Sequence, residues 1–87
     1  MTITIKYVSE FIRSYNKLEL DLQKEVLEKI QLFKKTENHK SLKTHKLHGR
    51  LRGRYGFSVN YKYRIIFEYI DKKTAVLLTI GDHDIYK

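Results

Sequence analysis

The spacing of apolar residues changes twice along this 87-residue chain, and these changes limit the folds that it can adopt. Residues 2–7 alternate apolar and polar side chains, which is typical of a half-buried strand. From residue 9 to residue 35 the apolar side chains recur every three or four positions, as in amphipathic helices. Three more runs, at 54–60, 63–70 and 74–80, are rich in β-branched and aromatic residues. The order strand, helix, helix and three strands predicts an α+β fold.

The helical region is expected to consist of two segments. Ser9 has the residue type and position of a helix N-cap. The pattern breaks at residues 16–17, and a longer helix is expected from about Leu18 to Lys35. The two segments form either a helical hairpin or one kinked helix. The apolar stripe of the longer segment comprises Leu18, Leu22, Val26, Ile30 and Phe33, with Leu20 and Leu27 beside it.

The last three runs predict an antiparallel meander, because only short polar segments separate them. Residues 71–73, with the sequence Asp-Lys-Lys, form the expected turn between the second run and the third. The expected sheet is small, twisted and mostly antiparallel, with the helical hairpin packed on one face. Residues 36–44 are polar and are expected to form a loop. A chain of this length is expected to form one domain, spanning residues 1–87.

The formal net charge of +8 is concentrated in one part of the sequence. Residues 34–64 contain ten Lys or Arg and one acidic residue, so their net charge is +9. The rest of the chain contains eight Lys or Arg and nine Asp or Glu, so its net charge is −1. A local field of this sign favours a polyanionic partner, and nucleic acid is the usual one.

The composition also excludes several kinds of site. The chain has no cysteine, which rules out disulfides and thiolate metal sites. No apolar run has the length of a membrane span, and the N-terminus lacks the apolar region of a signal peptide. The expected core is too small for a deep pocket around a large cofactor. We therefore expect a cytoplasmic protein without a cofactor and without a membrane partner.

Three of the four histidines lie in the basic stretch, which raises the possibility of acid–base chemistry on a phosphate. A ribonuclease that uses no metal needs a base for the proton of the ribose 2′-hydroxyl. It also needs an acid for the departing 5′-oxygen and a cation for the charge of the phosphorane. Two histidines and an arginine supply these three functions near neutral pH. RNA carries its own nucleophile, so a metal-activated water is not required.

Three motifs stand out among the strands and their flanking residues. They are His-x-Leu-x-Gly-x-Leu-x-Gly from His45 to Gly53, the run Tyr-Arg-Ile-Ile-Phe at 63–67, and Gly-x-His-x-x-Tyr from Gly81 to Tyr86. With the order of elements, they resemble the RelE/ParE superfamily of toxins, above all its YafQ and YoeB branches. The resemblance covers nearly the whole chain. It implies a toxin of a type II toxin–antitoxin system that cleaves mRNA on the ribosome.

The resemblance also implies partners and residue roles. The partners are a cognate antitoxin, mRNA and the ribosome, and operator DNA through the antitoxin. His45 falls at the position of the general base, His83 at that of the general acid, and Arg64 at that of an arginine that stabilises the phosphate. Tyr86 falls at a terminal aromatic residue that stacks on a base. The residues expected to hold RNA phosphates are Lys43, Lys46, Arg50, Arg52 and Arg54.

The chain departs from the pattern of these branches at three places. Ser58 stands where the YafQ branch has a further catalytic histidine, and Lys62 stands where it has an aspartate. Residues 55–56 are Tyr-Gly where the YoeB branch commonly has Trp-Ser. Two rival functions therefore stay open. One is a ParE-like toxin that inhibits DNA gyrase by binding, and the other is a non-catalytic module that binds nucleic acid.

Individual residues also have simpler interpretations. His39 lies in a polar loop outside any motif and is expected to be solvated, and His48 is expected to be an exposed neighbour of the site. The alternative interpretation of Arg64 is a charge at the end of a strand that pairs with Glu68 or Asp82. A metal site is a minor alternative, because the spacing of its candidate ligands matches no established site. Those candidates are His45, His48, His83, Asp82 and Asp84.

Overall fold

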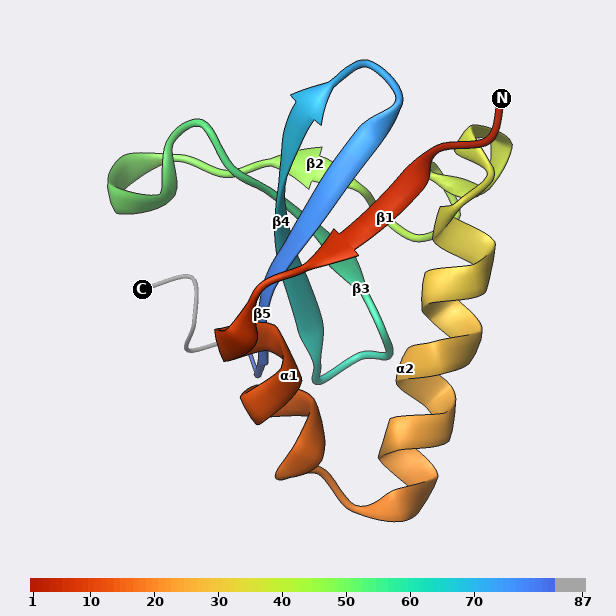
Figure 1. Ribbon diagram of the computed structural model, residues 1–87, viewed down its shortest axis with the longest axis vertical. Helices are drawn as coiled ribbons and strands as arrows, with labels where there is room; N and C mark the ends of the chain where they lie inside the picture. Colours follow the sequence, from red (N-terminus) through yellow and green to blue (C-terminus); the bar gives the residue numbers. More distant parts are fainter. Residues whose placement is uncertain (83–87) are drawn as a thin grey trace.

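The computed structural model describes residues 1–82, which form two α-helices and five strands (Figure 1). Two short 3₁₀ turns, η1 (Thr36–Asn38) and η2 (Gly49–Leu51), precede and follow the second strand. The predicted order of elements is confirmed, and the structure adds one strand of two residues. In chain order the elements are β1 (Thr4–Tyr7), α1 (Ser9–Asn16), α2 (Leu20–Phe33), β2 (His45–Lys46), β3 (Tyr55–Ser58), β4 (Arg64–Asp71) and β5 (Thr74–Gly81).

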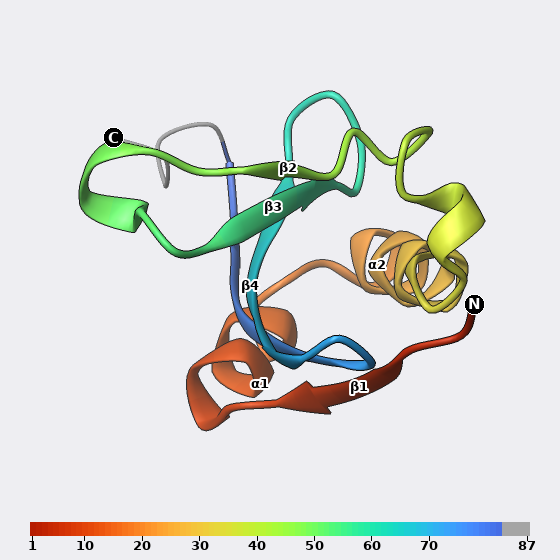
Figure 2. The same cartoon turned by 90° about the horizontal axis from the view of Figure 1, so that it is seen from above.

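The five strands form one sheet in the order β1-β5-β4-β3-β2. β1 runs parallel to β5, and every other pair of neighbours is antiparallel. β3, β4 and β5 are the predicted meander, with the predicted turn between Asp71 and Thr74. Figure 2 shows how the sheet curves from β1 at one edge to β2 at the other. The prediction of a small, mostly antiparallel sheet is therefore confirmed.

The core lies between the helices and one face of the sheet. Val26, Ile30 and Phe33 of α2 are buried, as the apolar stripe predicts. The ring of Phe33 stacks on Phe57 of β3, with a centroid distance of 4.2 Å, and meets Phe67 of β4 edge-on at 4.7 Å. These contacts hold the central strands against α2. The opposite face of the sheet is not covered by the helices.

The ends of the helices differ from the prediction. Ser9 is the first helical residue rather than the N-cap; Val8 occupies the cap position and provides no side-chain hydrogen bond. The N–H of Val8 donates to the carbonyl of Leu77 in β5, so the extended backbone of β1 continues for one residue more. α2 begins two residues later than Leu18, and α1 ends at Asn16. The helical region is thus two separate helices, and not one kinked helix.

β2 is the element that the pattern does not predict. It has two polar residues and pairs with β3 at the edge of the sheet, His45 opposite Gly56 and Lys46 opposite Tyr55. The segment that follows, with η2 at its end, extends beyond the sheet on the side away from α2 (Figures 1 and 2). Neither of the two helices within residues 1–82 is long and apolar enough to cross a membrane.

Candidate active site

The register of the sheet places His45 and Arg64 on the same face. Directly paired residues share a face, and so do residues two apart along a strand. His45 pairs with Gly56, and Ser58, two positions further along β3, pairs with Arg64. Phe57 lies between these two positions and is fully buried in the core. The face that carries His45 and Arg64 is therefore the one turned away from the helices, called the outer face below.

A hydrogen bond to the backbone orients the ring of His45. Nδ1 of His45 lies 2.7 Å from the carbonyl oxygen of Lys43. Because a carbonyl can only accept, Nδ1 carries the proton, and in the neutral ring Nε2 holds the lone pair. Lys43 has a φ of 57°, in the left-handed region that residues other than glycine seldom adopt. The backbone at Lys43 thus presents an exposed imidazole in the tautomer that a general base at Nε2 requires.

The guanidinium of Arg64 is tied to the loop between β3 and β4. Its Nη1 donates to the carbonyl of Asn60 at 2.6 Å and to the carbonyl of Tyr63 at 3.0 Å. Within residues 1–82 these bonds leave the edge formed by Nε and Nη2 available, and that edge has the geometry for bidentate contact with a phosphate. The alternative pairing of Arg64 with Glu68 is wrong, because Glu68 accepts from Nε of Arg54 at 3.0 Å.

The basic residues chosen from the sequence gather around β2 and η2. Lys43, Lys46, Arg50 and Arg52 are exposed. Arg54 is also exposed, but the carboxylate of Glu68 offsets its charge. Glycines with left-handed backbones begin and follow the turn that carries Arg50 and Arg52, with φ of 66° at residue 49 and 90° at residue 53. The two glycines of the motif therefore stand at positions where the turn requires a left-handed backbone.

His83 and Tyr86, the expected acid and the expected stacking residue, lie outside the described residues. The last residue of β5, Gly81, pairs with Arg64. In the sequence, Gly81 is two residues before His83. Within residues 1–82 no group of three or more His, Asp or Glu side chains could hold a metal ion. The alternative metal site included His83 and Asp84 and thus falls partly outside this range.

The prediction that His39 is solvated is wrong, because its side chain is half-buried. Its ring stacks on Phe33 with a centroid distance of 4.4 Å and an interplanar angle of 11°. Its Nε2 donates to the carbonyl of Phe33 at 2.8 Å, at the last residue of α2. His39 therefore stabilises the C-terminal end of α2 and takes no place in the candidate active site.

Asn60 is the residue of the site that sequence reasoning overlooked. Its Oδ1 accepts from the N–H of Lys62 at 2.9 Å and from the N–H of Tyr63 at 2.8 Å. These bonds fix the loop whose carbonyls hold Arg64. An asparagine at the end of a strand-like run is a turn signal, but the sequence pattern assigned Asn60 to the run at 54–60.

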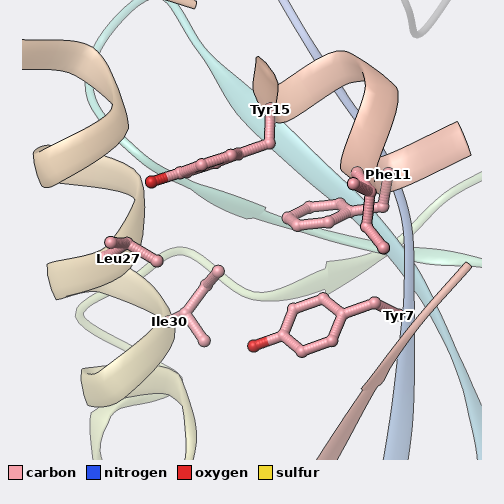
Figure 3. A pocket seen from close by; sticks show the side chains of 6 residues that line it. Tyr7, Phe11, Tyr15, Leu27 and Ile30 are labelled. Atoms are coloured by element: carbon pink, nitrogen blue, oxygen red, sulfur yellow. The ribbon is translucent and has the colours of Figure 1, made fainter. Parts of the chain in front are cut away.

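A second surface is an apolar groove of about 190 Å³ between α1, α2 and β1. Figure 3 shows the rings of Tyr7, Phe11 and Tyr15 around this groove, opposite Leu27 and Ile30 of α2. Ile12 completes the lining. About half of the surface of Tyr7, Ile12 and Leu27 stays exposed, at 48%, 51% and 49%. These are apolar side chains that the molecule itself leaves partly uncovered.

Comparison with solved structures identifies the fold. No protein-family model and no curated protein sequence matches the chain. Among solved structures, the RelBE2 toxin–antitoxin complex from Mycobacterium tuberculosis is similar, with a TM-score of 0.73 and 20% identity over 95% of this chain and 100% of the other. The archaeal RelE–RelB complex from Pyrococcus horikoshii has a TM-score of 0.72 and 18% identity over 94% and 96%. The YoeB–YefM complex from Staphylococcus aureus has a TM-score of 0.70 and 16% identity, over 95% of this chain and 99% of the other. The chain thus has the fold of the RelE-like toxins.

Proposed function

We propose that the chain is the toxin of a type II toxin–antitoxin system and cleaves mRNA on the ribosome. The observation that carries this proposal is the position of His45 and Arg64 on one face of the sheet, in the most basic part of the chain. With strands about 4.8 Å apart and a rise of about 3.4 Å per residue, a flat sheet would put their Cα atoms on the order of 12 Å apart. Both side chains are long enough to approach one phosphodiester from opposite sides of such a gap.

The proposed reaction uses the 2′-hydroxyl of RNA as the nucleophile. His45 takes its proton at Nε2, and the 2′-oxygen forms a bond to phosphorus. The bond from phosphorus to the 5′-oxygen breaks, and His83 donates a proton to that oxygen. The Nε and Nη2 edge of Arg64 holds the negative charge of the phosphorane. The products are one end with a 2′,3′-cyclic phosphate and one end with a 5′-hydroxyl.

The surrounding charges support binding to RNA. Lys43, Lys46, Arg50 and Arg52 would neutralise phosphates of mRNA or ribosomal RNA. We expect less from Arg54, because Glu68 already pairs with it. Tyr86 would stack on a base of the substrate.

The apolar groove supports a protein partner. We propose that the antitoxin covers it, because Ile12 and Leu27 are half-exposed there. The three similar structures are complexes of a toxin with an antitoxin. The antitoxin would also bring the chain to operator DNA. All of these encounters would take place in the cytoplasm.

Mapping of mRNA ends in cells that express the chain tests this function. The wild type is expected to produce new 5′ ends within coding sequences as growth stops. His45→Ala should reduce these cuts by about 10²–10⁴-fold, as the loss of a general base does. His48→Ala, which removes an exposed histidine three positions away, should stay within about twofold.

Other outcomes would replace the proposal with one of its rivals. Growth arrest without new mRNA ends, together with inhibition of gyrase supercoiling, would favour the ParE-like function. Binding to RNA without cleavage on translating ribosomes would favour a non-catalytic module. Full cleavage by His45→Ala would remove the proposed mechanism.

A further inference from the structure

A second groove, of about 300 Å³, lies between residues 41–43 and the β3–β4 loop. Two of its lining residues also hold the candidate catalytic side chains. The carbonyl of Lys43 accepts from His45, and the carbonyl of Asn60 accepts from Arg64. The groove therefore lies beside the backbone groups that orient both. Its polar and aromatic lining comprises Lys29, Ser41, Lys43, Ser58, Asn60 and Tyr61.

Tyr61 forms the aromatic part of this groove. Its side chain is 87% exposed, the highest value among the large apolar and aromatic residues of the described chain. The loop that carries it is fixed, because the N–H of Val59 donates to the carbonyl of Tyr63 at 3.0 Å and Asn60 Oδ1 accepts two further bonds. A lone exposed tyrosine is ordinary. A tyrosine on an anchored loop beside a cationic groove has the features of a platform on which a nucleobase stacks.

The charges of the groove favour an anion. Lys43 is exposed at one side, and Lys29 lies at the other. Glu25 is the nearby carboxylate; its Oε2 is 4.0 Å from Nζ of Lys29, and its Oε1 accepts from Nδ2 of Asn60 at 2.7 Å. One carboxylate is thus shared between an amide and a distant ammonium. Two ammonium groups against one carboxylate leave a net positive charge for a phosphate.

We propose that this groove binds the nucleotide next to the scissile phosphate. Its base stacks on Tyr61, and its phosphate contacts Lys43 and Lys29. A volume of about 300 Å³ is at the lower end of the range for ligand sites, which suits one nucleotide rather than several. This inference rests on the proposed ribonuclease function, since it assigns the groove to the same RNA strand.

Binding of a fluorescently labelled single-stranded RNA octamer, measured by anisotropy in a His45→Ala background, tests the assignment. Because base–aromatic stacking contributes about 1–3 kcal/mol, Tyr61→Ala should raise Kd by about 5- to 150-fold. Tyr61→Phe keeps the ring and should bind like the background protein. Ile70→Ala, which removes an exposed apolar side chain near the end of β4 and outside both grooves, is the control and should not change Kd.

The salt dependence of the same binding tests the cation. Lys43→Gln should reduce the slope of log K against log salt concentration by about 0.7, the value for one phosphate contact on a single strand. Lys72→Gln removes the same charge at the exposed β4–β5 turn and should leave the slope unchanged. No binding of the octamer, or equal effects of Tyr61→Ala and Ile70→Ala, would overturn the proposal. An acidic peptide that competes as well as RNA, with no effect of Tyr61→Ala, would also overturn it.

Cleavage by the same Tyr61 variants on translating ribosomes, with His45 intact, separates this proposal from the function on which it rests. If the wild type cleaves and Tyr61→Ala changes neither affinity nor cleavage, the groove assignment is wrong and the function stands. If the wild type does not cleave but Tyr61→Ala still weakens RNA binding, the nuclease function is wrong and the groove remains a nucleotide site.

Discussion

His39 and His45 both donate a ring N–H to a backbone carbonyl, but their surroundings differ. His39 stacks on Phe33 at the end of α2 and is half-buried. His45 is exposed on the outer face of the sheet, in the register that it shares with Arg64. The first contact stabilises a helix end. The second fixes the orientation of the ring that we propose as the general base.

His39→Ala is expected to lower the free energy of unfolding by about 1–2 kcal/mol, the sum of one hydrogen bond and one ring contact. Urea denaturation monitored by circular dichroism measures this change. His48→Ala should change the free energy of unfolding by less than about 0.5 kcal/mol, because that side chain is exposed. Equal stability of the His39→Ala variant and the wild type would show that the ring does not stabilise α2.

Sequence motifs could single out His45 and Arg64 as candidates, but they could not predict the contacts of His39. The first two belong to motifs with recognisable spacing. The partner of His39 is the carbonyl at the end of α2, and the polar loop gives no sign of that contact. The sequence did not predict the hydrogen-bond partners of Arg64. These are the carbonyls of Asn60 and Tyr63, which lie beside the guanidinium only because the β3–β4 loop folds back toward it.

At the scale of elements, the β3–β4 loop positions Arg64. Asn60 Oδ1 fixes the loop through the N–H groups of Lys62 and Tyr63, and the loop carbonyls then hold the guanidinium. Asn60 is thus a positioning residue. In the proposed reaction it would act on the phosphate only through Arg64.

Asn60→Ala is expected to reduce single-turnover cleavage on ribosomes by about tenfold, and Arg64→Ala by about 10²–10³-fold. Because the first change acts through Arg64, the double variant should be no slower than Arg64→Ala alone. A double-mutant cycle on the cleavage rates measures this coupling. Independent, multiplying effects would contradict the positioning role.

The β4–β5 turn provides a prediction about pH. The N–H of Lys73 donates to Oδ1 of Asp71 at 2.8 Å, and this bond holds the pKa of Asp71 below its ordinary value of 3.8. The folded state therefore favours the charged carboxylate. Its contribution to stability is fully present above pH 3.8 and is lost as the pH falls through the lower folded pKa.

Asp71→Asn should accordingly have a lower Tm than the wild type at pH 7, and the difference should shrink below pH 3.8. Asparagine keeps an acceptor for the Lys73 N–H but cannot titrate. Calorimetry of both proteins from pH 7 to pH 2.5 measures the difference. A gap in Tm that stays constant with pH would contradict the assigned cause.

Elements with a clear period could be predicted, and short ones could not. β3, β4 and β5 were expected within two residues of their observed ends, because long runs of β-branched and aromatic residues favour strands. β2 has two polar residues, so its own sequence contains no period. Only its pairing with β3 makes it a strand, and that pairing is what places His45 on the outer face.

At the scale of the whole molecule, the two candidate functional surfaces lie near opposite edges of the sheet. The basic residues surround β2 at one edge, and the apolar groove adjoins β1 at the other. Figure 2 shows these edges on opposite sides of the curved sheet. Binding of an antitoxin at the groove and binding of RNA at the outer face should therefore be separable by mutation.

Leu27→Asp is expected to weaken binding of the cognate antitoxin by at least about 30-fold, because a charge in an apolar interface removes a central contact. Leu20→Asp is the matched control: Leu20 is exposed on the same helix, at 65%, but does not line the groove. Calorimetric titration measures both, and mRNA cleavage by both should match the wild type. Equal loss in the two variants, or a loss in neither, would exclude the groove as the antitoxin surface.

The chemical nature of the cut ends tests the central claim most directly, because that claim assigns proton transfer at the 2′-hydroxyl to His45. Ribosome-bound mRNA cleaved by the purified protein should carry 5′-hydroxyl and 2′,3′-cyclic phosphate ends, detected by selective ligation or by kinase-dependent labelling. Arg64→Ala should yield the same ends at a much lower rate. Ends with a 5′-phosphate and a 3′-hydroxyl, or intact mRNA, would contradict the account.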